Sequence, residues 1–207
     1  MKLDSIVFDL DGTLWDSTSS VIDSWNETIS NYNEVKNKLT VDDIKGVMGL
    51  VTEDIALKFF PDLEEENRLT IINHCCENEC THLEKHGAIL YDKVEEILND
   101  LAKKYKLFIV SNCQCGYIEA FFKSHKLNKY FIDYESSGRT GLNKGENIKL
   151  IIERNNLINP VYVGDTDGDL KASRFAGIPF IYARYGFGEV NDFDYAIDSF
   201  EELLKLV

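Results

Sequence analysis

A long uninterrupted apolar segment is the first feature that the sequence lacks. No run approaches the ~18 residues that a membrane-spanning helix needs. Near the N-terminus, Asp4, Asp9 and Asp11 interrupt the stretch in which a secretory signal would have its apolar core. We therefore expect neither a cleaved signal nor a membrane partner.

Positive charge is also scarce. The chain has 22 lysines and arginines against 36 aspartates and glutamates, a formal net charge of -14. A field of this sign repels nucleic acid phosphates and anionic membranes, so nucleic acid is not an expected partner. A small phosphorylated substrate stays compatible with the charge, because a few local cations and a metal ion can outweigh it.

Cysteine and proline are few. The chain has five cysteines, an odd number, and three prolines. With 207 residues it does not need disulfide bonds to stabilise its core, so we expect a reduced, cytoplasmic protein. No proline-rich linker or internal repeat divides the chain, and no pattern in it predicts an oligomeric state.

The chain does contain an alternation of β-rich runs and helical stretches. In the helical stretches apolar residues recur three and four positions apart, as at Ile148, Ile151 and Ile152. This alternation predicts an α/β fold with a mostly parallel sheet and helices on both of its faces. The predicted strands cover residues 3–8, 107–111, 130–134, 161–164 and 178–183.

One long segment departs from this alternation. Residues 16–89 show helical signals only. The pair Thr40 and Asp43 is typical of a helix start, and Pro61 is typical of a helix end. We predict that residues 1–15 and 90–207 form the core with the sheet, and that residues 16–89 form an inserted all-helical subdomain.

Carboxylates follow two of the predicted strands. Asp9 and Asp11 end the first strand, and Asp165 and Asp169 follow the strand at residues 161–164. Ligands of parallel α/β sheets bind at the carboxyl ends of the strands. Carboxylates gathered there are costly without a cation, and oxygen ligands suit Mg²⁺. The sequence therefore predicts a Mg²⁺ site, although an Asp-Gly turn would explain the first pair taken alone.

Two further groups are suited to bind phosphate oxygens. Ser111 and Asn112 end the strand at residues 107–111, and Lys144 precedes a predicted helix. Each has a common alternative, because Ser-Asn after a strand is usually a turn or a helix cap and a single lysine is usually solvated. The residues by themselves leave both alternatives open.

Taken in order, these groups resemble the four motifs of the haloacid dehalogenase superfamily. The motifs are Asp9-Leu10-Asp11-Gly12-Thr13-Leu14, Ser111-Asn112, Lys144 and Gly164-Asp165-Thr166-Asp167-Gly168-Asp169. The resemblance extends over essentially the whole chain and is closest to the phosphoglycolate-phosphatase-like branch. It implies a Rossmann-like core with an inserted helical cap of the C1 type, and a Mg²⁺-dependent phosphatase of small phosphorylated metabolites.

The resemblance also implies a role for each aspartate. Asp9 would be the nucleophile that forms an aspartyl-phosphate, and Asp11 would protonate the leaving oxygen and then activate water. Mg²⁺ would be held by the side chains of Asp9 and Asp165 and by the backbone carbonyl of Asp11. Asp169 would support the water shell of the metal or orient Lys144.

Four residues would contact the transferring phosphoryl group, according to the same resemblance. Ser111 and Lys144 would bind it directly, and positive charge fixed there stabilises the charge that develops in the transition state. Thr13 and Asn112 would be second contacts.

Two other functions share these residues. A phosphomutase of the β-phosphoglucomutase type has the same core residues but tends to differ at Thr13. A non-catalytic relative that binds a phosphorylated ligand would not need Asp11, and dehalogenases lack an acid there. The substrate would be selected by the cap, where Lys45, Lys58 and Arg68 are candidates that are equally compatible with surface charges.

Trp15 and the segment 90–94 depart from the pattern of the family. Relatives more often have a small or aliphatic residue at the position of Trp15 and a proline-rich turn at the position of residues 90–94. We expect both to lie near the hinges between core and cap without touching the chemistry.

The cysteines suggest two further hypotheses. The segment His74-Cys75-Cys76-x3-Cys80-x-His82-x3-His86 contains zinc-ligand residue types, but its spacing favours ordinary helix residues over a zinc site. Cys113 and Cys115 follow Ser111-Asn112 near a predicted helix start, where the pKa of a thiol can be lowered. We hypothesise that their oxidation impairs phosphate binding.

Overall fold

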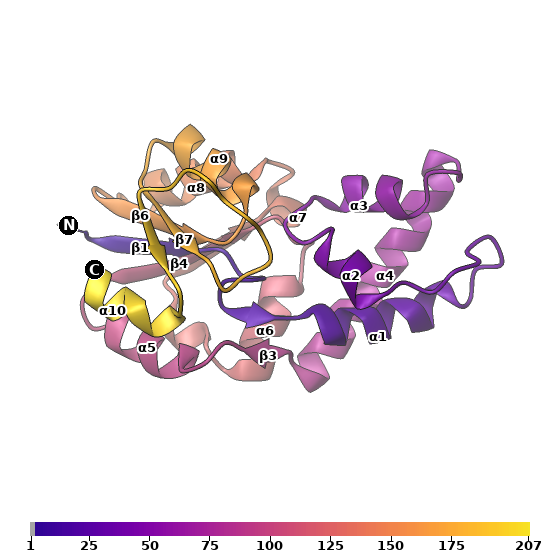
Figure 1. The fold of residues 1–207 in the computed structure, drawn as a ribbon, viewed down its shortest axis with the longest axis horizontal. Coiled ribbons are helices and arrows are strands. Elements are labelled where there is room, and N and C mark those ends of the chain that lie inside the picture. Colours follow the sequence, from indigo (N-terminus) through magenta and orange to yellow (C-terminus); the bar gives the residue numbers. More distant parts are fainter. Residues whose placement is uncertain (1–2) are drawn as a thin grey trace.

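Six parallel strands form the central sheet, in the order β5-β4-β1-β6-β7-β8 (Figure 1). The structure is a computed structural model that describes residues 3–207, so the first two residues of the predicted core segment lie outside the described part. The strands are β1 (Ser5–Phe8), β4 (Lys106–Ser111), β5 (Asp133–Ser136), β6 (Pro160–Gly164), β7 (Phe180–Ala183) and β8 (Tyr195–Ile197).

Helices cover both faces of this sheet, as the sequence predicts. Ile6 and Phe8 of β1 point into one apolar cluster, and Val7 between them points into the other. The first cluster packs under α5 (Val94–Leu101) and α6 (Tyr117–His125), and the second under α8 (Lys144–Arg154) and α9 (Asp167–Ala176). Short helices complete the core, namely η1 (Asn128–Tyr130), α7 (Ser137–Thr140), η2 (Phe200–Glu202) and α10 (Leu203–Leu206).

The strand predicted at residues 130–134 is misplaced. Residues up to Tyr130 form the 3-10 turn η1, Ile132 is exposed, and the strand β5 runs from Asp133 to Ser136. This edge strand contains polar residues, and Arg154 of α8 pairs with its Glu135 at 2.7 Å. An apolar pattern cannot locate such a strand, and the three-residue edge strand β8 was not predicted either.

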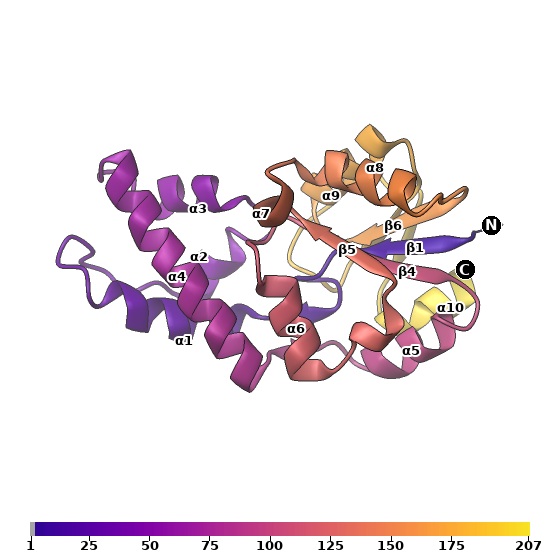
Figure 2. The same cartoon turned by 180° about the vertical axis from the view of Figure 1, so that it is seen from behind.

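Four helices lie to one side of the sheet, between residues 18 and 86 (Figure 2). They are α1 (Thr18–Ile29), α2 (Val41–Lys45), α3 (Thr52–Phe59) and α4 (Glu65–His86). The predicted helix start is confirmed, because Thr40 and Asp43 form a reciprocal capping box at α2. The helices enclose an apolar cluster of their own that includes Trp25, Ile44 and Ile72.

A two-stranded antiparallel pair joins the helices to the sheet. β2 (Trp15–Asp16) pairs with β3 (Ile89–Leu90), so the chain leaves the sheet region and returns to it at adjacent points. Neither short strand was predicted, because two residues are too few to show an alternation. Within residues 3–207, every helix is too short or too polar to cross a membrane.

Candidate active site

The first pair of aspartates lies directly beyond β1. The backbone N–H of Asp9 donates to the carbonyl of Val163 at 2.8 Å, so β6 fixes this residue on the strand beside it. Its side chain is buried. Gly12 then has a φ of +78°, which a residue with a side chain rarely adopts. The chain therefore turns sharply after the two acids and keeps both at the end of the sheet.

The second pair surrounds the start of α9. Thr166 caps this helix, because its Oγ1 accepts from the backbone N–H of Asp169 at 3.2 Å while the Asp169 carboxylate accepts from the backbone N–H of Thr166 at 2.9 Å. This capping box turns the Asp169 side chain inward. Asp165 and Asp169 are both fully buried.

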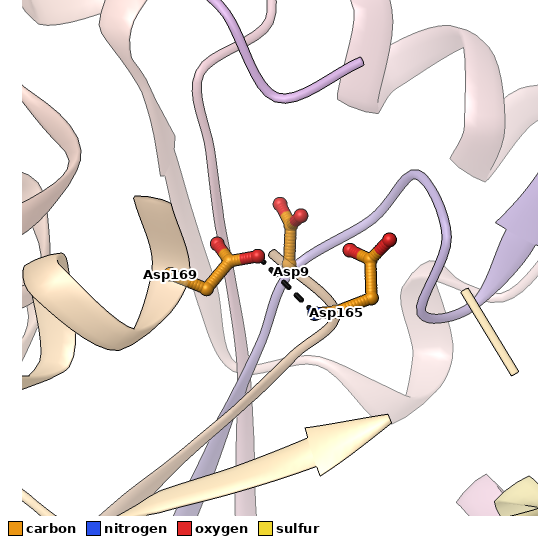
Figure 3. A group of neighbouring side chains, drawn as sticks. All are labelled: Asp9, Asp165 and Asp169. Carbon is orange, nitrogen blue, oxygen red and sulfur yellow. Dashed lines mark hydrogen bonds between the residues drawn. The ribbon is translucent and has the colours of Figure 1, made fainter. Parts of the chain in front are cut away.

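Three of these carboxylates meet at one point (Figure 3). One oxygen each of Asp9, Asp165 and Asp169 lies within 4.8 Å of the others. Lys144, at the start of α8, places its Nζ 3.0 Å from Asp9 Oδ1 and 2.6 Å from Asp169 Oδ1. The structure thus brings together residues from three predicted motifs that are far apart in the sequence.

The buried charges at this point do not balance. Three carboxylates face a single lysine, and burial followed by repulsion from Asp169 raises the pKa of Asp9 to about 7 despite the attraction of Lys144. Burial and the neighbouring acids raise the pKa of Asp165 well above its usual range. Burial opposes the charge of Lys144, but Asp169 and Asp9 outweigh it and raise the pKa of that ammonium group. A further cation would relieve this imbalance.

The donor set fits a divalent cation with oxygen ligands. Asp165 Oδ2 accepts from the backbone N–H of Phe187 at 2.7 Å, whereas its buried Oδ1 has no hydrogen-bond partner in the described chain. Asp169 differs, because its two oxygens already accept from Lys144 and from the backbone and hydroxyl of Thr166. Asp9 and Asp165 are therefore better placed than Asp169 to bind a metal directly.

Two glycines let the backbone approach Asp165. A Cβ on Gly12 would lie 2.1 Å from Asp165 Oδ2, and one on Gly186 would lie 2.3 Å from Asp165 Cβ. Any side chain at these positions would displace the carboxylate.

Asp11 is held by three hydrogen-bond donors that sequence reasoning missed. Trp15 Nε1, the hydroxyl of Ser17 and the hydroxyl of Tyr117 donate to the same oxygen, Asp11 Oδ1, at 2.8, 2.6 and 2.8 Å. Burial raises the pKa of Asp11, and these donors act against that rise. The expectation that Trp15 lies away from the chemistry is wrong. Its departure from the family pattern was the one signal in the sequence.

The groups predicted to contact phosphate have different surroundings. Ser111 and Asn112 line a small cavity of about 60 Å³ together with Asp9 and Asp11. The amide of Asn112 is already engaged, since it donates to the carbonyl of Gly49 at 2.8 Å and accepts from Ser137 at 2.9 Å. Thr13 is fully buried and is not among the residues that line the cavity.

The predicted substrate-selecting cations lie away from this cavity. Lys58 Nζ donates to the carbonyl of Gly46 at 2.7 Å, and Arg68 donates to the carbonyl of Leu63 at 3.2 Å. Lys45 is exposed. None of these three residues lines the cavity, so the structure gives no support to their selecting the substrate.

The cysteines lie in two places, on the long helix α4 and in the segment between β4 and α6. In residues 3–207, the cluster of metal-ligating side chains is the aspartate group, and the histidine- and cysteine-rich segment belongs to the long helix α4. Burial raises the pKa of the Cys113 thiol well above its usual range, with Asp11 adding to the shift. The lowering expected near a helix start is therefore not found at Cys113, a half-buried thiol three residues before the N-cap Gly116 of α6, and the effect of oxidation on phosphate binding stays a prediction.

With this geometry in view, comparison with known proteins identifies the family. The model of the haloacid dehalogenase-like hydrolases matches residues 6–183, and the chain belongs to this family. The resemblance predicted from the four motifs is confirmed, as is the α/β fold class.

Individual relatives are more distant. A phosphoglycolate phosphatase of Salmonella typhimurium is 26% identical over 154 residues, which make up 69% of this chain and 61% of that protein. The match therefore spans less than two thirds of this relative.

Solved structures share the whole architecture. A haloacid dehalogenase-like hydrolase of Streptococcus pneumoniae is 22% identical with a TM-score of 0.86, and the match covers 99% of this chain and 98% of that one. CbbY of Rhodobacter sphaeroides, in complex with phosphate, is 18% identical with a TM-score of 0.79, covering 97% and 96% of the two chains. At such identities the similarity establishes the fold alone.

Proposed function

We propose that this chain is a Mg²⁺-dependent phosphatase that hydrolyses a small phosphorylated metabolite through an aspartyl-phosphate on Asp9. The observation that carries the proposal is the buried group of Asp9, Asp165, Asp169 and Lys144. Beside this group lies Asp11, whose side-chain hydrogen bonds from the described residues all go to one carboxyl oxygen, Oδ1. Family membership and the names of the relatives support a phosphatase.

The cation would be held by Asp9, Asp165 and the backbone carbonyl of Asp11. When bound, it supplies Lewis-acid polarisation of the phosphoryl oxygens and favours the ionised form of Asp9. Asp169 has its oxygens engaged, so we assign it the positioning of Lys144 and indirect support of the metal.

The first half of the reaction uses both aspartates. A carboxylate oxygen of Asp9 forms a bond to phosphorus while the bond from phosphorus to the leaving oxygen breaks. Three donors occupy Oδ1 of Asp11, so the carboxyl proton of Asp11 is on Oδ2. Oδ2 gives this proton to the leaving oxygen. Lys144 and Ser111 hold the transferring group.

The second half reverses the proton transfer. Asp11 takes a proton from a water molecule that attacks phosphorus, which releases phosphate and restores the Asp9 carboxylate. We propose that the helical segment 16–89 acts as a cap on the core of residues 1–15 and 90–207, and that it excludes bulk water during these steps. The bond from Asn112 to Gly49 joins the two parts and supports this division.

A turnover assay tests the proposal. The purified chain is expected to release free phosphate from p-nitrophenyl phosphate and from small phosphate esters with Mg²⁺, and to lose this activity in EDTA. Asp9→Asn should lower kcat by ~10⁴-fold or more. Asp167→Asn is the matched control, since Asp167 belongs to the same motif as Asp165 but is exposed and pairs with Lys171.

Other outcomes identify the alternatives. Isomerisation of a sugar phosphate with the phosphate retained on the sugar would make the protein a mutase. Absence of turnover across a broad panel of esters would favour a non-catalytic binding protein. Full activity of Asp9→Asn would refute the nucleophile.

A further inference from the structure

Glu79 is a buried acid on the helical side of the cavity. It lies on α4, only 4% of its surface is exposed, and it lines the same cavity as Asp9 and Asp11. Its Oε2 accepts a hydrogen bond from Gln114 Nε2 at 2.8 Å. The Trp25 indole is a second neighbour of this carboxyl, because a hydrogen bond from Trp25 acts against the rise of its pKa. The carboxyl oxygens keep lone pairs that a ligand can use.

The rest of this wall is mostly apolar. The side chains that the helical segment contributes include Val21, Trp25, Ile44, Met48 and Ile55. The residues that line the cavity include three acids, Asp9, Asp11 and Glu79, and no lysine, arginine or histidine. A second negative charge on the substrate would therefore be desolvated without a counter-ion.

Trp25 adds a second polar group to the wall. Its Nε1 is buried and lies beside the Glu79 carboxyl without reaching normal hydrogen-bond geometry. A buried donor in poor geometry is costly, and a ligand that accepts a hydrogen bond would improve its pairing. The wall thus offers a carboxyl group with unused lone pairs, with the Trp25 N–H beside it, in an apolar surround.

We propose that Glu79 determines the specificity of this site, and that the leaving alcohol carries a hydrogen-bond donor, a hydroxyl or an ammonium group, and no negative charge. This inference rests on the proposed function and refines its substrate class. It separates the chain from its relatives named for phosphoglycolate, because the leaving group of phosphoglycolate carries a carboxylate.

The protonation of Glu79 is consistent with this reading. Burial, with repulsion from Asp11, raises the pKa of Glu79 to about 8. An ammonium group beside it would favour the ionised form and draw the proton away, whereas a hydroxyl can donate to either form. A carboxylate would meet an acid that is already poorly solvated.

A purely structural role for Glu79 is the competing explanation. The bond to Gln114 joins α4 to the loop that follows β4, so Glu79 also connects the helical segment to the core. Such a role would affect all substrates equally. A role in specificity changes the ratio between substrates, which is the quantity to measure.

Three esters with two-carbon leaving groups isolate the end group. They are 2-hydroxyethyl phosphate, O-phosphoethanolamine and phosphoglycolate, which end in a hydroxyl, an ammonium and a carboxylate. The wild-type protein with Mg²⁺ is expected to hydrolyse the better of the first two with a kcat/KM at least about 10-fold above that for phosphoglycolate. Whether the hydroxyl or the ammonium ester is faster distinguishes a polyol from an amino alcohol, and either result supports the proposal.

The variant Glu79→Gln preserves the volume and the bond to Gln114. It should lower the ratio of kcat/KM for O-phosphoethanolamine over phosphoglycolate by about 10-fold, because an amide cannot pair with an ammonium group. Glu77→Gln is the control, since Glu77 lies on the same helix with its side chain exposed. Thermal melting of both variants verifies that they fold.

Two results would overturn the proposal. One is a wild-type kcat/KM for phosphoglycolate equal to or above that for both other esters, which needs no variant. The other is an unchanged ratio in folded Glu79→Gln. Turnover of p-nitrophenyl phosphate shows which inference has failed. If the protein hydrolyses this compound, either of the two results above removes only the role of Glu79. If the protein hydrolyses neither this compound nor any other ester, the proposed phosphatase function fails.

Discussion

The strand-end wall of the site is the buried group of Asp9, Asp165, Asp169 and Lys144, of which only Asp9 lines the cavity. It differs from the helical wall in how its polar groups are paired. On the strand-end wall, Asp9 and Asp169 share Lys144, and Asp165 has one oxygen bound by the backbone and one left open. On the helical wall, apolar side chains surround Glu79, whose partners, Gln114 and Trp25, are both uncharged. The closely spaced charged groups of the strand-end wall suit a reaction that is common to many substrates. The apolar helical wall with its one acid suits the selection of one substrate among them.

The largest expected effect comes from removing the cation of the strand-end wall. Lys144→Met leaves three buried carboxylates without an ammonium group, so we expect the free energy of unfolding to fall by ~3 kcal/mol and kcat by ~10³-fold. The pKa of Asp9, about 7 in the intact site, should rise, because Lys144 lowers it, and residual activity should therefore need a higher pH. Denaturant titration and a pH-rate profile measure both effects.

Lys149→Met is the control for this prediction. Lys149 lies on the same helix with its side chain exposed over the ring of Phe175. Equal losses in the two variants would mean that the helix, and not the buried ammonium group, carries the effect.

A smaller effect is expected where the backbone approaches Asp165, the proposed metal ligand. Gly12→Ala should destabilise the fold by ~2–3 kcal/mol and weaken Mg²⁺ binding by about 10-fold, because its Cβ would displace Asp165. Gly141→Ala isolates the backbone strain, since Gly141 has a φ of +71° and no atom within 4 Å of an added Cβ. Equal Mg²⁺ affinity in both variants, measured by calorimetry, would contradict the role of this contact.

The donors on Asp11 should have a moderate effect. Tyr117→Phe removes one of three hydrogen bonds to Asp11 Oδ1, and we expect kcat to fall by about 10-fold. Because that bond favours the ionised form, its loss raises the pKa of Asp11 and moves the alkaline limb of the pH-rate profile to higher pH. Tyr134→Phe, which removes a bond to Glu119 away from the cavity, should leave the profile unchanged.

The smallest effect is expected from the cations outside the cavity. Lys58→Ala and Arg68→Ala should change kcat/KM by less than about 2-fold for every ester, while Lys58→Ala lowers the free energy of unfolding by ~1 kcal/mol through its bond to Gly46. A selective loss of activity toward an anionic ester would place a cation in the cavity and remove the contrast between the two walls.

The strand-end wall is the part of the molecule that the sequence predicts well. Its strands are buried on both faces and appear as continuous apolar runs, and its functional groups follow those runs directly. The strand at 130–134 was misplaced because Glu135 of β5 is paired with Arg154, a contact that no local pattern contains.

The helical wall could not be predicted in the same way. Glu79 is one more acid in a polar 22-residue helix, and its burial follows from packing against a loop 35 positions away. The donors on Asp11 have the same cause, since Tyr117 is 106 positions distant in the sequence. Local patterns predict elements and strand-end motifs, whereas these contacts arise from tertiary packing.

Ser17 couples the helical segment to Asp11, the acid to which we assign proton transfer. It stands at the N-cap position of α1, but its hydroxyl donates to Asp11, and Asp16 accepts from the backbone N–H of Thr18 instead. Any displacement of α1 therefore changes the number of donors on Asp11 Oδ1. In the proposed mechanism, a movement of the cap would therefore change the pKa of Asp11, and with it the ease with which Asp11 protonates the leaving oxygen.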